Sequence, residues 1–444
     1  MLHLFSAGGR NLALDSESGA LYQPDSLAMA LWPLMAGNKE AAIAALPAHD
    51  PLAVSEAYDD WKTLLDAPPA QDDRPEDSGL LKAICLHVAH DCNLRCRYCF
   101  ASTGGFKGSR SLMRFETGQA ALDMLLAASG DRPLVEVDFF GGEPMLNWDV
   151  VKALVAYGRK KEKQAGKRFQ FTLTTNAYEL PADAAGFLND EMHNLVLSID
   201  GRQWVHDAMR PAADGTGSYD KALRNAQNII AGRDDREYFV RGTFTRANLD
   251  FAEDVKALAA AGFDRVSVEP VVLDAASPLS LLEQHVPAIE AEYDRLLEWV
   301  FAYRQQNPNF HFFHFLADLE GGPCLKKRLS GCGAGVDYLA VTPQGQLYPC
   351  HQFVGRESYS LGDVGSGLQR PDIREAFTQN HVLNKAECAA CWARYHCCGG
   401  CAANAQAATG HIGKPYDMEC RLQKKRLECA LALYALENGD EAAI

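Results

Sequence analysis

Between residues 81 and 306, short apolar stretches alternate with longer stretches in which apolar residues recur every three or four positions. The short stretches predict β-strands and the longer ones amphipathic helices. Strands are expected at residues 84–89, 134–140, 169–174, 194–199, 238–243 and 265–271. Helices are expected at residues 115–128, 148–164, 182–189, 219–231, 251–261 and 279–303. This alternation predicts an α/β fold with parallel strands and crossover helices, arranged as a partial (β/α)6 barrel.

The first 65 residues have a different pattern. Residues 11–15 and 20–23 predict a hairpin, and residues 26–35, 39–45 and 53–65 predict helices. Residues 66–80 are acidic and rich in proline and lack apolar periodicity, which indicates a linker. We therefore expect an N-terminal unit at 1–65, a linker at 66–80, the barrel at 81–306 and a C-terminal unit at 307–444.

Charge and hydropathy exclude some partners. The formal net charge of −15 argues against a broad nucleic-acid-binding surface, because such a surface needs clustered Lys and Arg. The N-terminus lacks a basic segment followed by a long apolar run, and no stretch reaches the roughly eighteen apolar residues typical of a membrane-spanning helix. We expect a soluble, cytoplasmic protein that binds neither nucleic acid nor membranes.

Fourteen cysteines lie in two clusters, four between residues 85 and 99 and ten between 324 and 429. Such clustering in a long chain without a secretion signal indicates metal ligation rather than a disulfide scaffold. Cys92, Cys96 and Cys99 can supply three of the four ligands that a 4Fe-4S cluster usually takes, leaving one iron open. The alternatives are a zinc site, or three buried cysteines that pack as apolar residues.

Distinctive motifs follow the predicted strands. The cysteine triplet follows the first strand and Gly141-Gly142-Glu143-Pro144 follows the second, while Asn176, Ser198 and Arg241 lie at or near the ends of the next three. In barrels of this kind the active site lies at the C-terminal ends of the strands. An ordinary turn is the alternative for the glycine pair, and turns or helix caps are the alternative for the isolated polar residues.

The cysteine triplet, with Tyr98 just before its last member, resembles the motif of the radical S-adenosylmethionine (SAM) enzymes, which use a partial TIM-type barrel. The resemblance implies a 4Fe-4S cluster on Cys92, Cys96 and Cys99 whose open iron binds SAM. Reduction then releases a 5′-deoxyadenosyl radical that abstracts hydrogen from the substrate. It also implies that SAM is contacted by Tyr98, Gly141, Gly142, Glu143, Pro144, Asn176, Ser198 and Arg241.

Eight of the later cysteines lie in turn-rich sequence around a predicted hairpin at 338–350: Cys324, Cys332, Cys350, Cys388, Cys391, Cys397, Cys401 and Cys420. Eight thiolates suffice for two more cubes, with zinc as the alternative. The array resembles the SPASM extension of radical SAM maturases. That resemblance implies one auxiliary cluster on Cys324, Cys332, Cys350 and Cys401, and another on Cys388, Cys391, Cys397 and Cys420. Cys398 could replace Cys397, whereas Cys85 and Cys429 are expected in the core.

Residues 84–101, 329–335, 391–395 and 399–404 resemble the SCIFF (six cysteines in forty-five residues) maturases, which bridge a peptide Cys sulfur to a carbon of another residue. In such enzymes the substrate thiolate attacks a carbon radical and an auxiliary cluster removes the surplus electron. The N-terminal unit resembles winged-helix-like elements that bind a leader peptide as an added strand. The implied partners are a Cys-rich precursor peptide and an electron donor such as flavodoxin or ferredoxin. Alternatives are a formylglycine-forming or protein-crosslinking maturase, or a non-catalytic electron carrier.

Overall fold

The structure is a computed structural model, and it describes residues 1–66, 79–233, 236–317, 319 and 325–439. Most of the expected linker and Cys324 therefore lie outside the described residues. Among the described residues, no helix is both long and apolar enough to cross a membrane.

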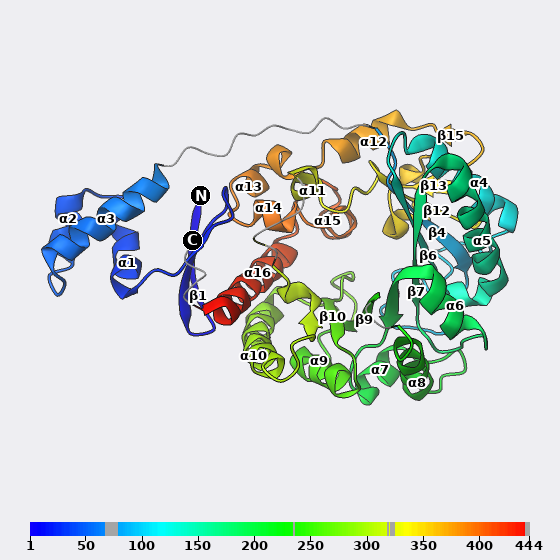
Figure 1. Ribbon diagram of the computed structural model, residues 1–444, viewed down its shortest axis with the longest axis horizontal. Coiled ribbons are helices and arrows are strands. Elements are labelled where there is room, and N and C mark those ends of the chain that lie inside the picture. Colours follow the sequence, from blue (N-terminus) through cyan, green and yellow to red (C-terminus); the bar gives the residue numbers. More distant parts are fainter. Residues whose placement is uncertain (67–78, 234–235, 318, 320–324, 440–444) are drawn as a thin grey trace.

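Six parallel strands form the centre of the molecule (Figure 1). They are β4 (Ala83–His90), β6 (Leu134–Gly141), β7 (Arg168–Thr175), β8 (Met192–Ser198), β9 (Glu237–Phe244) and β10 (Arg265–Pro270). Neighbours in the sheet follow the chain order, as right-handed strand–helix units require. In β6, Val135, Val137 and Phe139 are buried and alternate with less buried residues, so one face of the strand packs in the core. The predicted α/β fold with a parallel sheet is confirmed.

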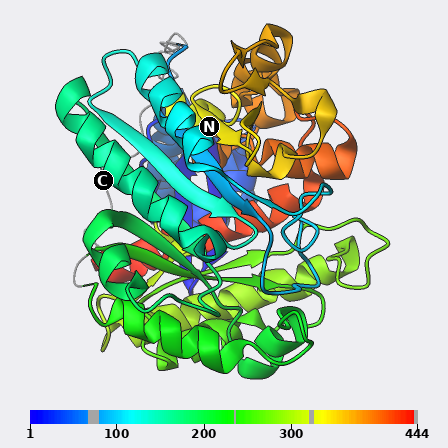
Figure 2. The same ribbon diagram turned by 90° about the vertical axis from the view of Figure 1, so that its right-hand side faces the viewer.

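The connecting helices cover the outside of this sheet (Figure 2). They are α4 (Phe115–Ala128), α5 (Trp148–Ala165), α6 (Ala184–Glu191), α7 (Gln203–Met209), α8 (Tyr219–Ile230), α9 (Phe251–Ala260) and α10 (Val286–Arg304). The short helix α7 was not predicted. The expected start of the last helix at residue 279 was wrong, because Pro287 lies in the first turn of α10. A proline has no N–H to donate and is favoured only at the start of a helix.

The C-terminal third continues the same sheet. Strand β11 (His311–Phe312) pairs with β10, and β12 (Tyr338–Val341) pairs with β4, both in parallel. The predicted hairpin is confirmed as β12 and β13 (Gln346–Tyr348), followed by β14 (Gly362–Asp363) and β15 (Gly367–Leu368); β5 (Ser111–Leu112) pairs with β4. The helices are α11 (Leu325–Ser330), α12 (Pro371–Thr378), α13 (Ala386–Ala389), α14 (Arg394–Cys397), α15 (Ala402–Thr409) and α16 (Asp417–Asn438). The sheet thus crosses residue 306, and the domain division stays a prediction.

The N-terminal unit has an antiparallel sheet of β1 (Leu2–Ala7), β2 (Arg10–Asp15) and β3 (Leu21–Tyr22). Strands β2 and β3 are the predicted hairpin, and β1 was not predicted. Its helices are α1 (Ser26–Leu31), α2 (Lys39–Ala45) and α3 (Pro51–Leu65). Helix α1 is shorter than expected because the chain continues as a 3-10 turn containing Pro33.

The N-terminal sheet lies between helices α1 to α3 on one side and helix α16 on the other (Figure 1), and it packs in an apolar layer on each of its faces. On one face, Phe5, Leu12 and Leu14 belong to the main core of the molecule. On the other face, Ala13 packs in a separate cluster with Val54 and Trp61 of α3. The alternation of side chains along a strand explains how one sheet serves both layers. The N-terminal unit therefore shares part of the main hydrophobic core.

Candidate active site

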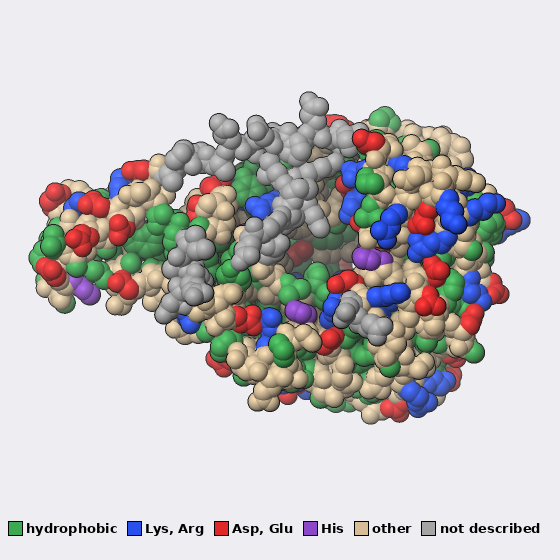
Figure 3. Space-filling view, viewed as in Figure 1, with side chains coloured by type: hydrophobic (Ala, Val, Ile, Leu, Met, Phe, Trp, Pro, Cys, Tyr) green, Lys and Arg blue, Asp and Glu red, His purple; other side chains and the backbone are tan. Residues whose placement is uncertain are grey.

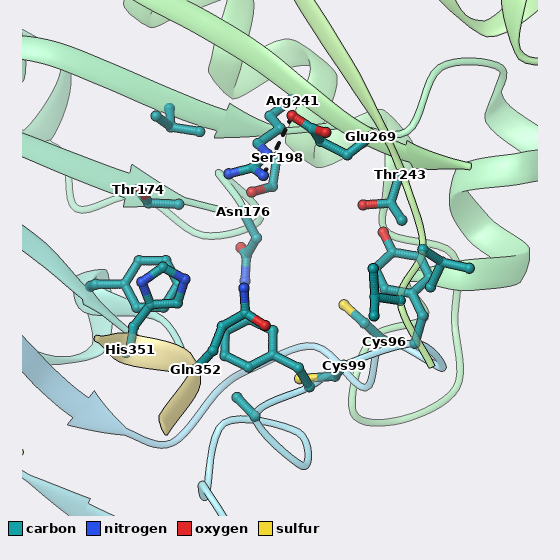
Figure 4. A pocket seen from close by; sticks show the side chains of 18 of the residues that line it. Cys96, Cys99, Thr174, Asn176, Ser198, Arg241, Thr243, Glu269, His351 and Gln352 are labelled. Atoms are coloured by element: carbon teal, nitrogen blue, oxygen red, sulfur yellow. Dashed lines mark ion pairs between the residues drawn. The ribbon is translucent and has the colours of Figure 1, made fainter. Parts of the chain in front are cut away.

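A cavity of about 700 Å³ lies inside the partial barrel. Its wall is formed by the carboxyl ends of the parallel strands, by the loop that follows β4, and by α16 from the end of the chain. The face in Figure 3 is hollowed near its middle, and Figure 4 shows side chains from several strands pointing into the hollow. A ligand there would be enclosed by residues that are far apart in the sequence.

The three cysteines of the first group line this cavity. Their loop is held by the end of α7 and the residues that follow it, because the Arg95 N–H donates to the Pro211 carbonyl at 2.8 Å and the Arg97 N–H to the Met209 carbonyl at 2.9 Å. Burial raises the pKa of the Cys92 thiol to about 12 and that of Cys96 to about 11. A metal would have to displace these protons, since thiolates are the ligands.

Gly141 and Gly142 bring the end of β6 against the cysteine loop. A β-carbon on Gly141 would lie 2.2 Å from the Ala89 carbonyl oxygen, and one on Gly142 would lie 2.1 Å from the Asp91 carbonyl oxygen. The Glu143 N–H donates to the same Asp91 carbonyl at 2.8 Å. A side chain at either position would clash with these carbonyl oxygens. The glycine pair is therefore required for steric reasons and does more than form a turn.

The Glu143 carboxylate is buried and ties β6 to β7. It accepts hydrogen bonds from the Thr175 hydroxyl at 2.7 Å, the Asn176 N–H at 2.8 Å and the Met145 N–H at 3.1 Å. Burial raises its pKa to about 7, and these hydrogen bonds oppose the shift. Pro144 opens the 3-10 turn that follows.

Asn176, Ser198 and Arg241 lie along one wall of the cavity (Figure 4). The Asn176 amide nitrogen donates to the side-chain oxygen of Asn93 at 2.9 Å, which links it to the cysteine loop. Ser198 and Arg241 are partners in the register of β8 and β9. The structure thus brings these three residues, the glycine pair and the cysteine triplet to one cavity.

Tyr98 has a buried partner that the sequence did not assign. Its hydroxyl lies 2.8 and 2.6 Å from the two carboxylate oxygens of Asp200. Arg210 forms an ion pair with Asp200 at 3.0 Å, and the Thr243 N–H donates to the same carboxylate at 3.0 Å. The position of Asp200 directly after β8 was a signal for its role, but no local pattern pointed to Arg210.

Glu269, at the end of β10, is surrounded by cationic and imidazole groups. Its carboxylate lies 3.6 Å from Arg241, 3.6 Å from Arg426 of α16 and 3.1 Å from His314. Burial alone would raise the pKa of Glu269, but His314, Arg426 and Arg241 hold it well below its usual value. Sequence reasoning missed Arg426, because α16 follows the barrel by more than a hundred residues.

The C-terminal cysteines fall into two electrostatically interacting groups. Cys332, Cys350 and Cys401 interact with one another, and Cys420 interacts with Cys388, Cys391 and Cys397. Burial raises the pKa of Cys350 and Cys397 to about 12 each and that of Cys401 and Cys420 to about 11 each. The two ligand sets implied by the resemblance stay a prediction, and Cys324 lies outside the described residues.

Other cysteines take different positions. Cys398 adopts a left-handed conformation at the end of α14, and its sulfur lies 3.6 Å from the His396 carbonyl oxygen. Cys85 and Cys429 are buried in the main core, as predicted. Every cysteine in the described part of the chain is a free thiol.

Thiols grouped in threes and fours are a donor set suited to iron–sulfur clusters. Within the described ranges, no three His, Cys, Asp or Glu side chains converge as ligands of one metal ion. The thiolates of a 4Fe-4S cube bind different irons, so its ligands need not meet at one point. The grouped thiols therefore fit the binding of iron–sulfur clusters.

Comparison with known proteins agrees with this site. Residues 86–233 match the family model of the radical SAM superfamily. The chain is 28% identical over 355 residues to the mycofactocin maturase MftC of Mycolicibacterium smegmatis, covering 77% of this chain and 82% of that protein.

Two solved structures share the fold. The structure of anSMEcpe with bound AdoMet superposes with a TM-score of 0.67 at 20% identity, covering 82% of this chain and 97% of that one. Streptococcus suis SuiB bound to S-adenosylmethionine gives a TM-score of 0.53 at 16% identity, covering 91% and 95%. Residues 86–233 thus match the radical SAM superfamily in sequence, and the parallel sheet agrees with the fold of the two solved structures.

Proposed function

We propose that the protein is a peptide maturase that installs sulfur-to-carbon thioether crosslinks in a ribosomally made Cys-rich peptide. One observation carries the proposal: the cavity is lined by Cys92, Cys96 and Cys99 and also by residues close to Cys401, which belongs to a second cysteine group. Gln352 and Asn404 line the cavity together with Cys96 and Cys99, and the Gln352 amide nitrogen lies 3.9 Å from the Cys401 sulfur. A peptide held there would be close to both groups.

The cofactors of this function would be three 4Fe-4S clusters and SAM. Cys92, Cys96 and Cys99 would hold the first cluster, and the two C-terminal groups would hold the others, with Cys324 as the fourth ligand of the first of these. When bound, the first cluster and SAM supply a 5′-deoxyadenosyl radical that takes a hydrogen atom from the substrate. The SAM contacts would come from Tyr98, Gly141, Gly142, Glu143, Pro144, Asn176, Ser198 and Arg241, which gather at the carboxyl ends of the strands.

The protein's own residues position these groups. The glycine pair allows the end of β6 to touch the cysteine loop, and Glu143 fixes the start of the Asn176 turn. The Tyr98–Asp200–Arg210 contacts anchor the loop on the opposite side. Rigid placement of this kind is what radical chemistry requires of a protein, because the cofactor carries the reaction itself.

Chemistry and the relatives both support a peptide substrate with cysteines. Each thioether bridge removes a hydrogen atom from a carbon, a proton from a thiol and one surplus electron from the peptide. An auxiliary cluster held by the C-terminal cysteines would accept that electron. MftC is named a maturase, and SuiB has been solved with its precursor peptide SuiA, which supports a peptide substrate here.

The N-terminal unit would bind the leader of this peptide. Its sheet ends at β1 on one side and at β3 on the other, and neither pairs with a further strand among the described residues. A peptide can add to such an edge through main-chain hydrogen bonds. The reducing electron would come from a donor such as flavodoxin or ferredoxin.

The second candidate is a maturase that oxidises a Cys or Ser to formylglycine, favoured by the 28% identity over 152 residues to the cysteine-type anaerobic sulfatase-maturating enzyme of Clostridium novyi. A simple electron carrier is disfavoured, because it has no use for a cavity of about 700 Å³. The two maturases leave different products, since a thioether retains the sulfur and formylglycine from Cys loses it.

The test is anaerobic co-expression of the enzyme with a short Cys-rich precursor peptide, taken from a reading frame adjacent to that of the enzyme where one encodes such a peptide. We expect the peptide mass to fall by two hydrogens per bridge and one alkylatable thiol to disappear with each. The control is the same experiment with Cys92→Ala, Cys96→Ala and Cys99→Ala combined, which should leave the peptide unchanged. Loss of sulfur with gain of a hydrazine-reactive aldehyde would instead favour the formylglycine reaction, and an unmodified peptide would contradict both.

A further inference from the structure

The N-terminal sheet contacts residues 388–397, which carry Cys388, Cys391 and Cys397 and are called the cysteine segment below. The His3 ring stacks on Trp392 with a centroid distance of 3.7 Å and an interplanar angle of 4°. The His3 Nε2 also lies 2.9 Å from the Glu428 carboxylate of α16. Trp392 directly follows Cys391, so a residue near the start of the chain packs against this cysteine segment.

A second contact lies in the turn between β2 and β3. Glu17 forms an ion pair with Arg394, and the two side chains are only 15% and 11% exposed. Arg394 also donates to the Ala389 carbonyl at 2.7 Å. Ala389 lies between Cys388 and Cys391, and Arg394 begins the helix that ends at Cys397. Glu17 is thus connected through one guanidinium to both ends of the cysteine segment.

The cysteine segment has little regular structure of its own. Its two helices, α13 and α14, have four residues each. Helices of this length are not stable without tertiary contacts. The spacing of Cys388, Cys391 and Cys397 therefore depends on what packs against the segment, and the N-terminal sheet supplies two of those contacts.

We propose that His3 and Glu17 are positioning residues for the cysteine group Cys388, Cys391, Cys397 and Cys420. The inference rests on the proposed function, in which this group holds an auxiliary cluster and the N-terminal unit binds the leader peptide. His3 lies on the edge strand β1, and Glu17 lies in the turn between β2 and β3. A strand added to the free edge of β1 would therefore lie beside the strand that carries the His3 contact, which places peptide recognition and cluster geometry in one network.

The test compares His3→Ala and Glu17→Gln with a matched control, Asp59→Asn. The control also removes an ion pair from the N-terminal unit, that of Lys39 with the exposed Asp59, on a helix outside this interface. A further variant, His3→Phe, keeps a ring that can stack on Trp392. The circular dichroism melt of each variant establishes that it is folded.

The first measurement is hydrogen exchange of residues 388–398 in the metal-free full chain. We expect His3→Ala and Glu17→Gln to exchange at least about tenfold faster than the control, since each loses a contact to the segment, and a tenfold change corresponds to about 1.4 kcal/mol. His3→Phe should restore slower exchange. Equal exchange in all variants would overturn the proposal.

The second measurement uses the reconstituted full chain. Iron release to a chelator should be faster in His3→Ala and Glu17→Gln, and the midpoint potential of one cluster should differ from that of the control, because solvent access tunes such potentials. Unchanged release and potential would also contradict the proposal. If alanine variants of Cys388, Cys391 and Cys397 lose no iron, the cluster assignment in the proposed function fails, while hydrogen exchange still decides whether the two residues position the segment.

Discussion

Gly142 lies so close to Asp91 that a β-carbon at this position would be 2.1 Å from the Asp91 carbonyl oxygen. The contact joins the end of β6 to the start of the cysteine loop, whose backbone also accepts the Glu143 N–H. The glycine-containing motif and the cysteine triplet are therefore one structural unit.

The substitution Gly142→Ala should push the end of β6 and the cysteine loop apart. We expect weaker SAM binding and loss of iron from the first cluster, because the loop must move by an ångström or more for the new methyl group to fit. Isothermal titration with SAM and iron analysis measure these effects. The control is Gly186→Ala, on the exposed side of α6 with no atom within 4 Å, which should stabilise the protein by about 0.5–1 kcal/mol. Normal SAM binding by Gly142→Ala would contradict the prediction.

Iron content tests the number of clusters. Anaerobic reconstitution should give about twelve irons and about twelve sulfides per chain, since three cubes are expected. Replacing Cys92, Cys96 and Cys99 together by Ala should leave roughly two-thirds of the iron and abolish formation of 5′-deoxyadenosine. Saturation near four irons in the intact protein would remove the auxiliary clusters from the proposal.

His206 should make the fold sensitive to acid. Its Nδ1 accepts from the Asp200 N–H at 3.3 Å, and its Nε2 lies 2.9 Å from the Ser218 hydroxyl. That hydroxyl donates to the Arg210 carbonyl, so the ring must donate to Ser218 and is neutral. Burial, with Arg210 nearby, lowers the pKa of His206 to about 3.

Because this pKa lies below the value of about 6.5 in the unfolded chain, protons bind the unfolded state first. Stability should fall as the pH drops below about 6.5, by about 1.4 kcal/mol per pH unit for this group. In His206→Gln, the free energy of unfolding, measured with urea between pH 7 and pH 4, should depend less steeply on pH, by about 1.4 kcal/mol per pH unit. The matched control is His193→Gln, which replaces an exposed ring. If the unfolding free energy of His206→Gln depends on pH as in the intact protein, the His206 ring does not take up a proton when the protein unfolds, and the prediction is wrong.

Deletion of residues 1–77 should do more than remove a recognition unit. Phe5, Leu12 and Leu14 belong to the main core, and each buried side chain of this size contributes about 1.5–3 kcal/mol. We expect a lower melting temperature and loss of iron from the last cysteine group. Differential scanning calorimetry and iron analysis measure both. A truncated protein with the stability and iron content of the intact chain would show that the N-terminal unit is independent.

The sequence by itself determined the elements that depend on local pattern. Alternation and helical periodicity located the six parallel strands and most of their helices, because residues that face one core recur at the period of their own element. The cysteine spacings indicated iron–sulfur clusters, because several ligands of one cube can lie close together along the chain. Errors occurred where a single proline altered a helix, as at Pro287 and Pro33.

Only the tertiary structure decided which distant residues meet. Arg210 reaches Asp200 because the segment after α7 folds back over the cysteine loop, and Arg426 reaches Glu269 because α16 packs against α10. His3 reaches Trp392 because the N-terminal sheet buries one face in the main core. No periodicity within a segment encodes these contacts. The burial of apolar faces depends on the shape of the whole molecule, and it brings together residues that lie far apart in the sequence.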